Sequence, residues 1–270
     1  MSTYEVMRLP VSTPPPRSSL AGRCIFVSGA GSGIGRASAL RLAEAGASVV
    51  ASDVRSEAVK EVGEALVKAG GSAPQLSLAC DVADEASVAA AFARADEVGQ
   101  VDGLVACAGV SLPTTTHESS LDAWQTVLSV NLTGIFLVAK HALIRMRECG
   151  GTIVTIGSTA SLVATGRSPA YAASKGGVLQ FTRYIAAEYA DSGIRANCLC
   201  PGLVATDILA NSNRLVGAPP SGTPRRRVTA LQDRAADPIE IADVVAFLSS
   251  AASSFMTGAA VAVDGGYTTI

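Results

Sequence analysis

Short apolar runs alternate along this chain with longer stretches in which apolar residues recur at helical spacing. In the first half of the chain, helical stretches of about 10–15 residues separate consecutive runs. The runs that predict strands are Cys24–Ser28, Ser48–Ser52, Gln75–Ala79, Gly103–Ala106, Thr152–Ile156, Ile194–Cys200 and Ala259–Val263. This alternation predicts an α/β fold, with a doubly wound parallel sheet of about seven strands and helices on both faces.

Helical periodicity marks the intervening segments. The predicted helices are Ala37–Ala45, Glu57–Ala69, a segment before Gly99, Leu121–Glu148, Lys175–Ala190 and Pro238–Ser249. The longest of them has Asn131 near its middle, among apolar neighbours. An Asn amide competes for the backbone hydrogen bonds of a helix, so Asn131 calls for an explanation.

Changes in composition divide the chain. Residues 1–20 contain the run Pro14–Pro16 among Ser and Thr and lack the apolar core of a signal peptide, which predicts a flexible extension. Residues 21–270 are expected to form a single catalytic domain, since α/β folds of this length are commonly one unit. Within it, residues 208–236 contain several prolines and the run Arg225–Arg227, which predicts a lid over the site.

The overall composition excludes several classes of function. Charged residues make up only 16% of the chain, below the roughly 25% typical of soluble domains, which predicts a homo-oligomer. The net charge of −2 leaves no basic footprint for nucleic acid, and no apolar run approaches the ~18 residues that span a membrane. Six cysteines without C-x-x-C spacing and only two histidines argue against a metal site and favour a reducing, cytoplasmic location.

A glycine-rich loop directly follows the first predicted strand. Its glycines, Gly29, Gly33 and Gly35, have the spacing G-x-x-x-G-x-G and lead into a helix. Glycines at such a junction permit positive φ and let the backbone approach a pyrophosphate at a helix N-terminus. The loop predicts a dinucleotide site, although a tight turn alone would also use these glycines.

Carboxylates follow the second and third predicted strands. Asp53 is placed to accept hydrogen bonds from both ribose hydroxyls of an adenosine and to repel a 2′-phosphate. Ser32 supplies no positive charge, and Arg55 is interpreted as a solvated residue at a helix start, so NAD is favoured over NADP. Asp81 is placed to reach an adenine amino group, or, like Asp84, to cap the next helix.

Tyr171 and Lys175 are four residues apart, so on a helix they share one face. A Lys ammonium beside a phenol favours the phenolate by charge, and such a phenol exchanges protons with an alcohol or carbonyl oxygen near neutral pH. Ser158 follows the fifth predicted strand and is placed to donate a hydrogen bond to the same oxygen. The pair alone arises easily by chance, so its interpretation depends on the rest of the chain.

Taken in order, these motifs resemble those of the classical short-chain dehydrogenase/reductase family over roughly Leu20–Tyr267. Asn131, Ser158, Tyr171 and Lys175 match the catalytic tetrad of that family. The resemblance implies a Rossmann-like fold and a homotetramer formed through the helices that carry Asn131 and Tyr171. It further implies a cofactor site made by Gly29, Ser32, Gly33, Ile34, Gly35, Asp53, Asp81, Val82, Ala108, Gly109, Tyr171, Lys175, Pro201, Gly202, Val204 and Thr206.

The resemblance also implies a mechanism. Tyr171 would be the general acid/base, Lys175 would hold the nicotinamide ribose, and Ser158 would orient the substrate oxygen. Asn131 would anchor a water molecule that links Lys175 to solvent. The leading expectation is an NAD-dependent oxidoreductase that transfers a hydride between the cofactor and a small-molecule secondary alcohol or ketone.

Two alternatives stay open. An NADP-dependent 3-oxoacyl-carrier-protein reductase is a common role on this scaffold, but Asp53 and Ser32 argue against it. A non-catalytic dinucleotide sensor or scaffold would often lack the Tyr or the Lys, and here both are present.

Two positions depart from the family pattern. Ala106-Cys107-Ala108-Gly109 stands where Asn-Asn-Ala-Gly is usual, which puts in doubt some hydrogen bonding within the sheet. Gly157 stands where a second Ser is common before the catalytic one, and it is expected to enlarge the site locally.

The substrate is not indicated by the sequence. Its walls are expected to come from Val110–Pro113, Thr159–Ser168 and the lid. Arg167 and Arg225–Arg227 leave room for an anionic substrate.

Overall fold

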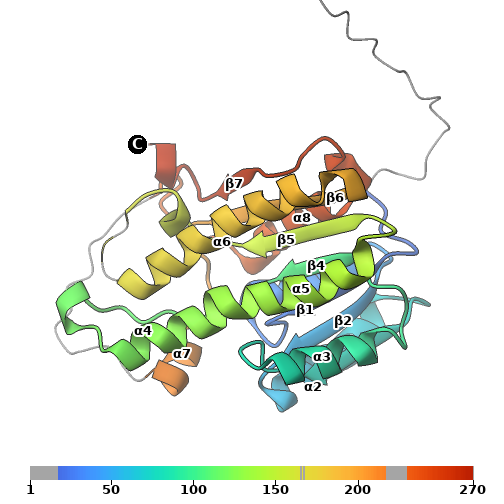
Figure 1. Ribbon diagram of the computed structural model, residues 1–270, viewed down its shortest axis with the longest axis horizontal. Helices are drawn as coiled ribbons and strands as arrows, with labels where there is room; N and C mark the ends of the chain where they lie inside the picture. Colours follow the sequence, from blue (N-terminus) through green and yellow to red (C-terminus); the bar gives the residue numbers. More distant parts are fainter. Residues whose placement is uncertain (1–17, 165, 167, 217–229, 270) are drawn as a thin grey trace, which may run out of the picture.

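Seven parallel strands form one sheet, in the order β3-β2-β1-β4-β5-β6-β7. The computed structural model describes residues 18–164, 166, 168–216 and 230–269, and Figure 1 shows the strands with helices on both sides. The strands are β1 (Cys24–Ser28), β2 (Ser48–Asp53), β3 (Gln75–Ala79), β4 (Gly103–Ala106), β5 (Gly151–Ile156), β6 (Ile194–Pro201) and β7 (Ala260–Val263). Every predicted strand is present within one residue of its expected bounds, so the doubly wound sheet is confirmed.

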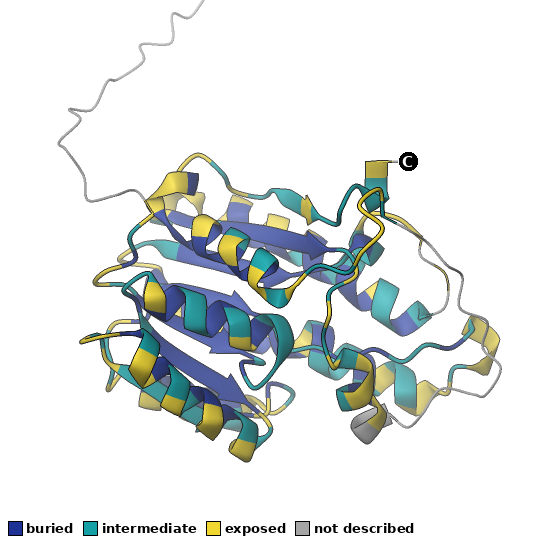
Figure 2. Ribbon diagram, turned by 180° about the vertical axis from the view of Figure 1, so that it is seen from behind, coloured by how far each residue is buried: buried dark blue, intermediate teal, exposed yellow. Residues whose placement is uncertain are grey.

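Helices cover both faces of this sheet. They are α1 (Gly33–Glu44), α2 (Ser56–Ala69), α3 (Glu85–Ala95), α4 (Leu121–Leu128), α5 (Gly134–Met146), α6 (Pro169–Glu188), α7 (Ile208–Val216) and α8 (Pro238–Ser249). Successive strand residues point to opposite faces. Ile25 and Val27 pack with α1, α2 and α8, whereas Phe26 packs with α3, α5 and α6. The five inner strands are accordingly buried, the edge strands β3 and β7 are partly exposed, and the outer faces of the helices are exposed (Figure 2).

Two helices begin earlier than the sequence indicated. Helix α1 begins at Gly33, directly after the glycine loop, and α6 begins at Pro169. Proline suits the first helical turn because its missing N–H would have no intrahelical partner there. Tyr171 and Lys175 therefore lie in the same helix, one turn apart.

The predicted helix Leu121–Glu148 is interrupted at its middle. A π-helical turn, Ser129–Thr133, separates α4 from α5. Asn131 lies in this turn, is fully buried, and pairs with Val110 instead of competing for bonds within its own helix. Turns of this kind are rare and occur often at functional sites. The π turn thus accounts for a polar residue in an otherwise apolar helix.

The helical stretch Leu121–Met146 is long and apolar enough, by length and composition alone, to cross a membrane. The stretch is not one apolar run, because polar residues such as Asn131 and Lys140 interrupt it, but its mean hydropathy reaches that of a membrane span. Half of its most apolar window is buried within the protein, where α5 packs against β4 and β5. Packing on the sheet explains this composition, since core helices share it with membrane spans.

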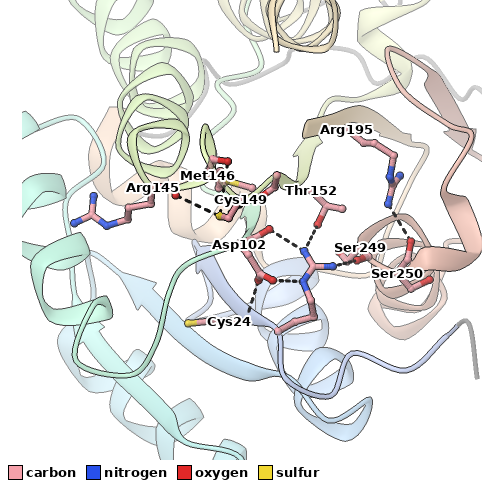
Figure 3. Close-up of polar contacts among 11 residues, drawn as sticks. Cys24, Asp102, Arg145, Met146, Cys149, Thr152, Arg195, Ser249 and Ser250 are labelled. Carbon is pink, nitrogen blue, oxygen red and sulfur yellow. Dashed lines mark hydrogen bonds and ion pairs between the residues drawn. The ribbon is translucent and has the colours of Figure 1, made fainter. Parts of the chain in front are cut away.

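A polar cluster ties together the amino ends of the central strands. Arg23 Nη2 donates to Asp102 O at 2.8 Å and to Thr152 Oγ1 at 3.2 Å, and Arg23 Nη1 donates to Ser249 O at 3.1 Å. Arg23 Nε also pairs with the Asp102 carboxylate. Figure 3 shows Asp102, Thr152 and Ser249 converging on one guanidinium. The cluster holds the end of the sheet that is opposite the predicted site.

Candidate active site

The predicted site residues gather at the carboxyl end of the sheet. The chain order reverses between β1 and β4, and a doubly wound sheet binds its ligand outside the strand ends at such a switch point. The residues that follow the strand ends here are the glycine loop 29–35, Asp53, Asp81, Val82, Ala108, Gly109, Ser158 and the segment 201–206. The topology therefore brings together residues that are far apart in the sequence.

The glycine loop lies against the end of β4. Gly29 has φ of +68°, and a Cβ on it would lie 2.7 Å from the backbone N of Ala108. A Cβ on Gly35 would clash with the carbonyl oxygen of Gly29. Ile34 is part of the core beneath the loop. Glycine is thus required at 29 and 35 for the loop to pass between α1 and β4.

The N-terminus of α1 carries free hydrogen-bond donors. Its N-cap residue, Ser32, makes no side-chain capping bond, and the first turn has no acidic residue. The first N–H groups of a helix have no intrahelical partner, and the helix dipole favours an anion there. A pyrophosphate fits this end of α1 both by charge and by hydrogen bonding.

The Asp53 carboxylate is buried, and both of its oxygens already accept hydrogen bonds from the protein. Its Oδ2 accepts a hydrogen bond from Gly31 N at 2.9 Å, and its Oδ1 accepts from the backbone N and the Nε of Arg55, each at 3.0 Å. Asp53 is only 7% exposed. The interpretation of Arg55 as a solvated residue was therefore wrong, because its guanidinium forms an ion pair with Asp53.

Arg55 also joins the glycine loop to helix α7. Its Nη2 donates to Ser32 Oγ at 2.9 Å, and its Nη1 donates to Asn211 Oδ1 at 3.1 Å. Asn211 Nδ2 donates to the same Ser32 hydroxyl at 3.3 Å. Helix α7, which carries Asn211, is thereby connected to the adenosine side of the predicted cofactor site. The Arg225–Arg227 run and Arg167 lie outside the described residues.

The residues after β3 have separate tasks. Asp84 accepts a hydrogen bond from Ala86 N and caps α3, as the capping interpretation predicted. Asp81 is exposed and its Oδ1 accepts from Ala83 N at 2.9 Å. Val82 is buried against Gly134 at the start of α5, where a Cβ on the glycine would lie 2.7 Å from Val82 Cγ2. Val82 is therefore a packing residue as well as a candidate neighbour of the adenine.

Lys175 brings a buried positive charge to the centre of the site. It is 3% exposed, and its Nζ donates to Ile156 O at 2.7 Å. The ammonium lies 5.6 Å from the centre of the Tyr171 ring. No acidic side chain forms an ion pair with Lys175 within the described part of the chain. A buried cation without a counter-ion favours the approach of an anion.

The Asn131 amide is held from two sides. Val110 N donates to Asn131 Oδ1, and Asn131 Nδ2 donates to Val110 O, each at 2.8 Å. Asn131 Nδ2 also donates to Ser174 Oγ at 3.1 Å. Asn131 Oδ1 and Lys175 Nζ each lie 3.5 Å from the point that a Gly109 Cβ would occupy. Asn131 and Lys175 are thus neighbours across Gly109.

Ser158 begins a short 3-10 turn, Thr159–Ser161, directly after β5. Its hydroxyl accepts a hydrogen bond from Ala160 N at 3.1 Å, and its backbone N donates to Ser161 Oγ at 3.2 Å. This reciprocal pair is a capping box. The hydroxyl proton of Ser158 is used by neither bond, so it remains available to a substrate oxygen.

The space beside Gly157 is filled from within the protein. A Cβ on Gly157 would lie 2.7 Å from Cys198 Sγ, 3.0 Å from Ser161 Oγ and 3.2 Å from Cys200 Sγ. The expectation that Gly157 enlarges the site was therefore wrong. The two buried thiols lie 3.9 Å apart, and their mutual hydrogen bond together with burial raises the pKa of Cys200.

The departure at Cys107 does not break the contact between β1 and β4. Ser28 Oγ accepts a hydrogen bond from Cys107 N at 3.2 Å, which joins the ends of the two strands. Burial raises the pKa of the Cys107 thiol to about 12, so this side chain stays neutral. A hydroxyl on β1 thus supplies a link where the usual amides are missing.

The segment after Pro201 returns to the glycine loop. Val204 forms an isolated bridge with Ala236, and Thr206 Cγ2 lies 3.0 Å from the position of a Gly33 Cβ. Helix α7 follows, and Ser212 Oγ accepts a hydrogen bond from Ser111 N at 2.8 Å. Helix α7 and the segment before it thus link the glycine loop to the predicted substrate wall, Val110–Pro113.

Several residues of this region escaped the sequence analysis. Two of them contact predicted cofactor residues: Gly31 bonds to Asp53, and Asn211 bonds to Ser32. The other two, Ser161 and Ser174, bond to the predicted catalytic residues Lys175 and Asn131. Gly31 stood within a motif that was already recognised. Ser161 and Asn211 lie in segments that were expected to line the site, but neither was singled out, and Ser174 had no signal. Their roles depend on which segments meet in space.

Comparison with known proteins places the chain in a family. A family model described as enoyl-(acyl carrier protein) reductase matches residues 29–268. The chain is 44% identical to cis-4-hydroxycyclohexanecarboxylate dehydrogenase of Sinomonas cyclohexanicum, over 93% of this chain and 99% of the relative. It is 38% identical to D-threitol dehydrogenase of Mycolicibacterium smegmatis, over 92% of this chain and 94% of the relative.

A solved structure agrees with these relatives. It is a short-chain type dehydrogenase/reductase from Mycobacterium marinum, with a TM-score of 0.83, 31% identity, and coverage of 93% of this chain and 97% of that one. The protein is an oxidoreductase that acts on hydroxyl groups with a nicotinamide cofactor. The chain belongs to the classical short-chain dehydrogenase/reductase family.

Proposed function

We propose that this protein is an NAD-dependent oxidoreductase that interconverts a secondary alcohol and a ketone, with Tyr171 as the general acid/base. The observation that carries the proposal is the buried Lys175 ammonium, 5.6 Å from the Tyr171 ring and without an acidic partner among the described residues. In this proposal Tyr171 exchanges a proton with the substrate oxygen beside this buried positive charge.

The other polar residues have supporting roles in this proposal. Ser158 donates its hydroxyl proton to the substrate oxygen, and Lys175 uses its two remaining N–H donors on the nicotinamide ribose. A nicotinamide held beside these residues would supply the hydride chemistry at the substrate carbon. Asn131 Oδ1 keeps one acceptor site, which supports a water molecule between it and Lys175.

Tyr171→Phe is the direct test of this mechanism. The change removes only the hydroxyl, so we expect kcat to fall by at least 10²-fold, while the Kd for NADH changes less than about threefold. Oxidation of cis-4-hydroxycyclohexanecarboxylate is followed through NADH absorbance, and NADH binding through its fluorescence. Turnover that survives in the variant would exclude Tyr171 as the acid/base.

The choice of NAD is supported by Asp53. Its buried carboxylate ends β2 beside the glycine loop, and a carboxylate next to an adenosine ribose would repel a 2′-phosphate. We expect NADH to bind more tightly than NADPH, as measured by fluorescence titration of the purified protein. Tighter binding of NADPH would overturn this part of the proposal.

One observation favours a second candidate, an NADP-dependent 3-oxoacyl-carrier-protein reductase. The Arg55 guanidinium lies 2.9 Å from Ser32 Oγ and offsets part of the Asp53 charge, so it is placed to meet a 2′-phosphate. Reduction of a 3-oxoacyl-carrier protein with NADPH, faster than any alcohol oxidation with NAD, would favour this candidate.

The substrate is proposed to be a small alcohol with a second polar group. Support comes from the named activities of the relatives, which concern a hydroxylated ring carboxylate and a polyol. Val110 and Leu112 pack with Trp124 and Tyr171, which supplies an apolar wall beside the proposed acid/base. A panel of cyclic hydroxycarboxylates and polyols, assayed with NAD, tests this proposal.

We also propose a homo-oligomer formed through α5 and α6. Phe136, Ile144 and Tyr184 on these helices are 45%, 53% and 62% exposed, and exposed apolar side chains that gather on one face can mark an interaction site. A hollow between the two helices has an apolar floor with charged residues around it, and it is lined by Phe136, Lys140, Leu143, Ile144, Arg147, Phe181, Ile185, Glu188 and Tyr189. Light scattering of the eluted protein is expected to give a tetramer of the 27.3 kDa chain.

A further inference from the structure

Ser161 connects two segments that are distant in the sequence. It closes the 3-10 turn after Ser158, and its hydroxyl accepts a hydrogen bond from Ser158 N at 3.2 Å. The same hydroxyl donates to the carbonyl oxygen of Lys175, in α6, at 2.8 Å. One side chain thus joins the main chains of Ser158 and Lys175.

The bond to Lys175 is more than helix capping requires. A capping box needs only the reciprocal bonds between Ser158 and Ser161. The Ser158 capping bond to Ala160 N would remain if Ser161 lost its hydroxyl. The bond to Lys175 O instead fixes the distance between the turn and α6, which carries both Tyr171 and Lys175.

The surroundings of the Ser161 hydroxyl restrict its position. Its oxygen lies close to the position that a Cβ on Gly157 would occupy, and Cys198 Sγ and Cys200 Sγ lie close to that position as well. The missing side chain of Gly157 gives Ser161 the room to turn inward, because a Cβ there would lie 3.0 Å from Ser161 Oγ. The inward position of the Ser161 hydroxyl therefore depends on a glycine at position 157, next to Ser158.

We propose that Ser161 is a positioning residue, which sets the location of the Ser158 hydroxyl relative to Tyr171 and Lys175. The inference rests on the proposed function, in which these three side chains act on one substrate oxygen. Reacting groups must be held closely, and a misplacement of about 1 Å can lower a rate by roughly 10²-fold. Ser161 does not contact the substrate in this arrangement.

Ser161→Ala tests the inference, with cis-4-hydroxycyclohexanecarboxylate, or the fastest alcohol of the panel, and NAD. We expect kcat to fall by roughly tenfold, because the turn that carries Ser158 loses its tie to α6. The Kd for NADH should change less than about twofold, since α6 and its buried Lys175 keep their own packing. Ser161→Thr retains the hydroxyl and, at a half-exposed position, should keep kcat within about threefold of the native value.

Ser250→Ala is the matched control. Ser250 caps a 3-10 turn, Ala251–Ser253, and its Oγ accepts from Ala252 N at 3.2 Å and donates to Phe247 O at 2.8 Å. It lies near Arg195 and Ser249, at the opposite end of the sheet (Figure 3). This variant should lower the melting temperature much as Ser161→Ala does and leave kcat unchanged.

The outcomes separate the inference from the proposed function. If Tyr171→Phe abolishes turnover but Ser161→Ala keeps the native kcat, the positioning role is wrong and the mechanism stands. Equal losses of kcat in the Ala and Thr variants, with equal falls in melting temperature, would also overturn it, because the hydroxyl would then not matter. Turnover in Tyr171→Phe would overturn both.

Discussion

The Asn131 side chain pairs with both backbone polar groups of Val110, through two hydrogen bonds of 2.8 Å. This contact joins the π turn between α4 and α5 to the loop that follows β4. Asn131 is fully buried, so its amide cannot form hydrogen bonds with solvent in the folded protein. The two bonds to Val110 take the place of those bonds to water. The pair fixes the loop that carries Gly109 beside Lys175.

Asn131→Asp should be strongly destabilising. The substitution keeps the shape but replaces the two donors of Nδ2, so an oxygen would face Val110 O and Ser174 Oγ. A buried group left unsatisfied costs roughly 1–3 kcal/mol, and we expect a loss of about 2 kcal/mol in the free energy of unfolding, because the acceptors that Nδ2 served lose their donor. Urea denaturation measures it.

Asn197→Asp is the control for Asn131→Asp. Asn197 Nδ2 donates to Met256 O, and its Oδ1 accepts from Ala259 N, so it makes a similar two-point contact. Both variants should lose stability, but only Asn131→Asp should lower kcat at a temperature where both remain folded. Equal activity of the two folded variants would mean that Asn131 serves only packing.

Arg55→Gln should sharpen the preference for NADH. Arg55 provides a guanidinium next to Ser32, where a 2′-phosphate would bind. Its removal leaves the Asp53 carboxylate without its ion-pair partner. We expect the ratio of the NADPH and NADH dissociation constants to rise by about tenfold, the value of one charge-assisted hydrogen bond. Fluorescence titration with each nucleotide gives the ratio.

Arg94→Gln serves as the control for this charge. Arg94 lies in α3, where it is mostly exposed and pairs with Glu97. It should leave the ratio of the two dissociation constants unchanged. If Arg55→Gln also leaves it unchanged, Arg55 does not face the 2′ position of the bound nucleotide.

Gly157→Ala should overpack the core behind Ser158. The new methyl group would lie 2.7 Å from Cys198 Sγ, which is itself fully buried. Overpacking of this size costs about 1–3 kcal/mol in the free energy of unfolding. Urea denaturation of the variant measures the loss.

Cys198→Ala in the same chain removes the atom nearest to the new methyl group. The double variant should therefore be less destabilised than the sum of the two single changes, with a coupling of about 1 kcal/mol or more. Strict additivity would show that the backbone moves to accommodate the methyl group instead.

Glu240 is expected to make stability depend on pH in the acid range. Hydrogen bonds from Arg234, and then from the Asp237 backbone N, lower the pKa of this exposed carboxyl from about 4.5 to about 2. Because this pKa is lower in the folded state than in the unfolded state, ionised Glu240 stabilises the fold. The stabilisation is complete above the unfolded-state pKa of about 4.5 and is lost as the pH falls through the folded-state pKa of about 2.

Glu240→Gln measures this contribution. The melting temperature of the variant should lie a few degrees below that of the native chain above pH 5, and the gap should close toward pH 2. Glu64→Gln, at an exposed position of α2, should show no such closing. A gap that stays constant from pH 7 to pH 2 would exclude the ion pair as its source.

The alternation of apolar runs determined the architecture of this protein. Seven strands lie where the pattern placed them. The inner strands are buried on both faces, and such strands need a nearly continuous apolar run. The glycine loop, Asp53 and the pair Tyr171 and Lys175 were also visible, since their spacing is local. These features suffice to indicate the family and the reaction class.

Tertiary structure alone decided how these residues are held. Asn131 meets Val110 through a π turn, and periodicity cannot indicate a turn that one residue of extra backbone creates. Arg55 looked solvated from its place at a helix start, yet folding sets it between Asp53 and Asn211, which is 156 residues away. The space beside Gly157 looked open, because the thiols that fill it come from another strand. Contacts between distant segments leave no local pattern, so only the folded chain reveals them.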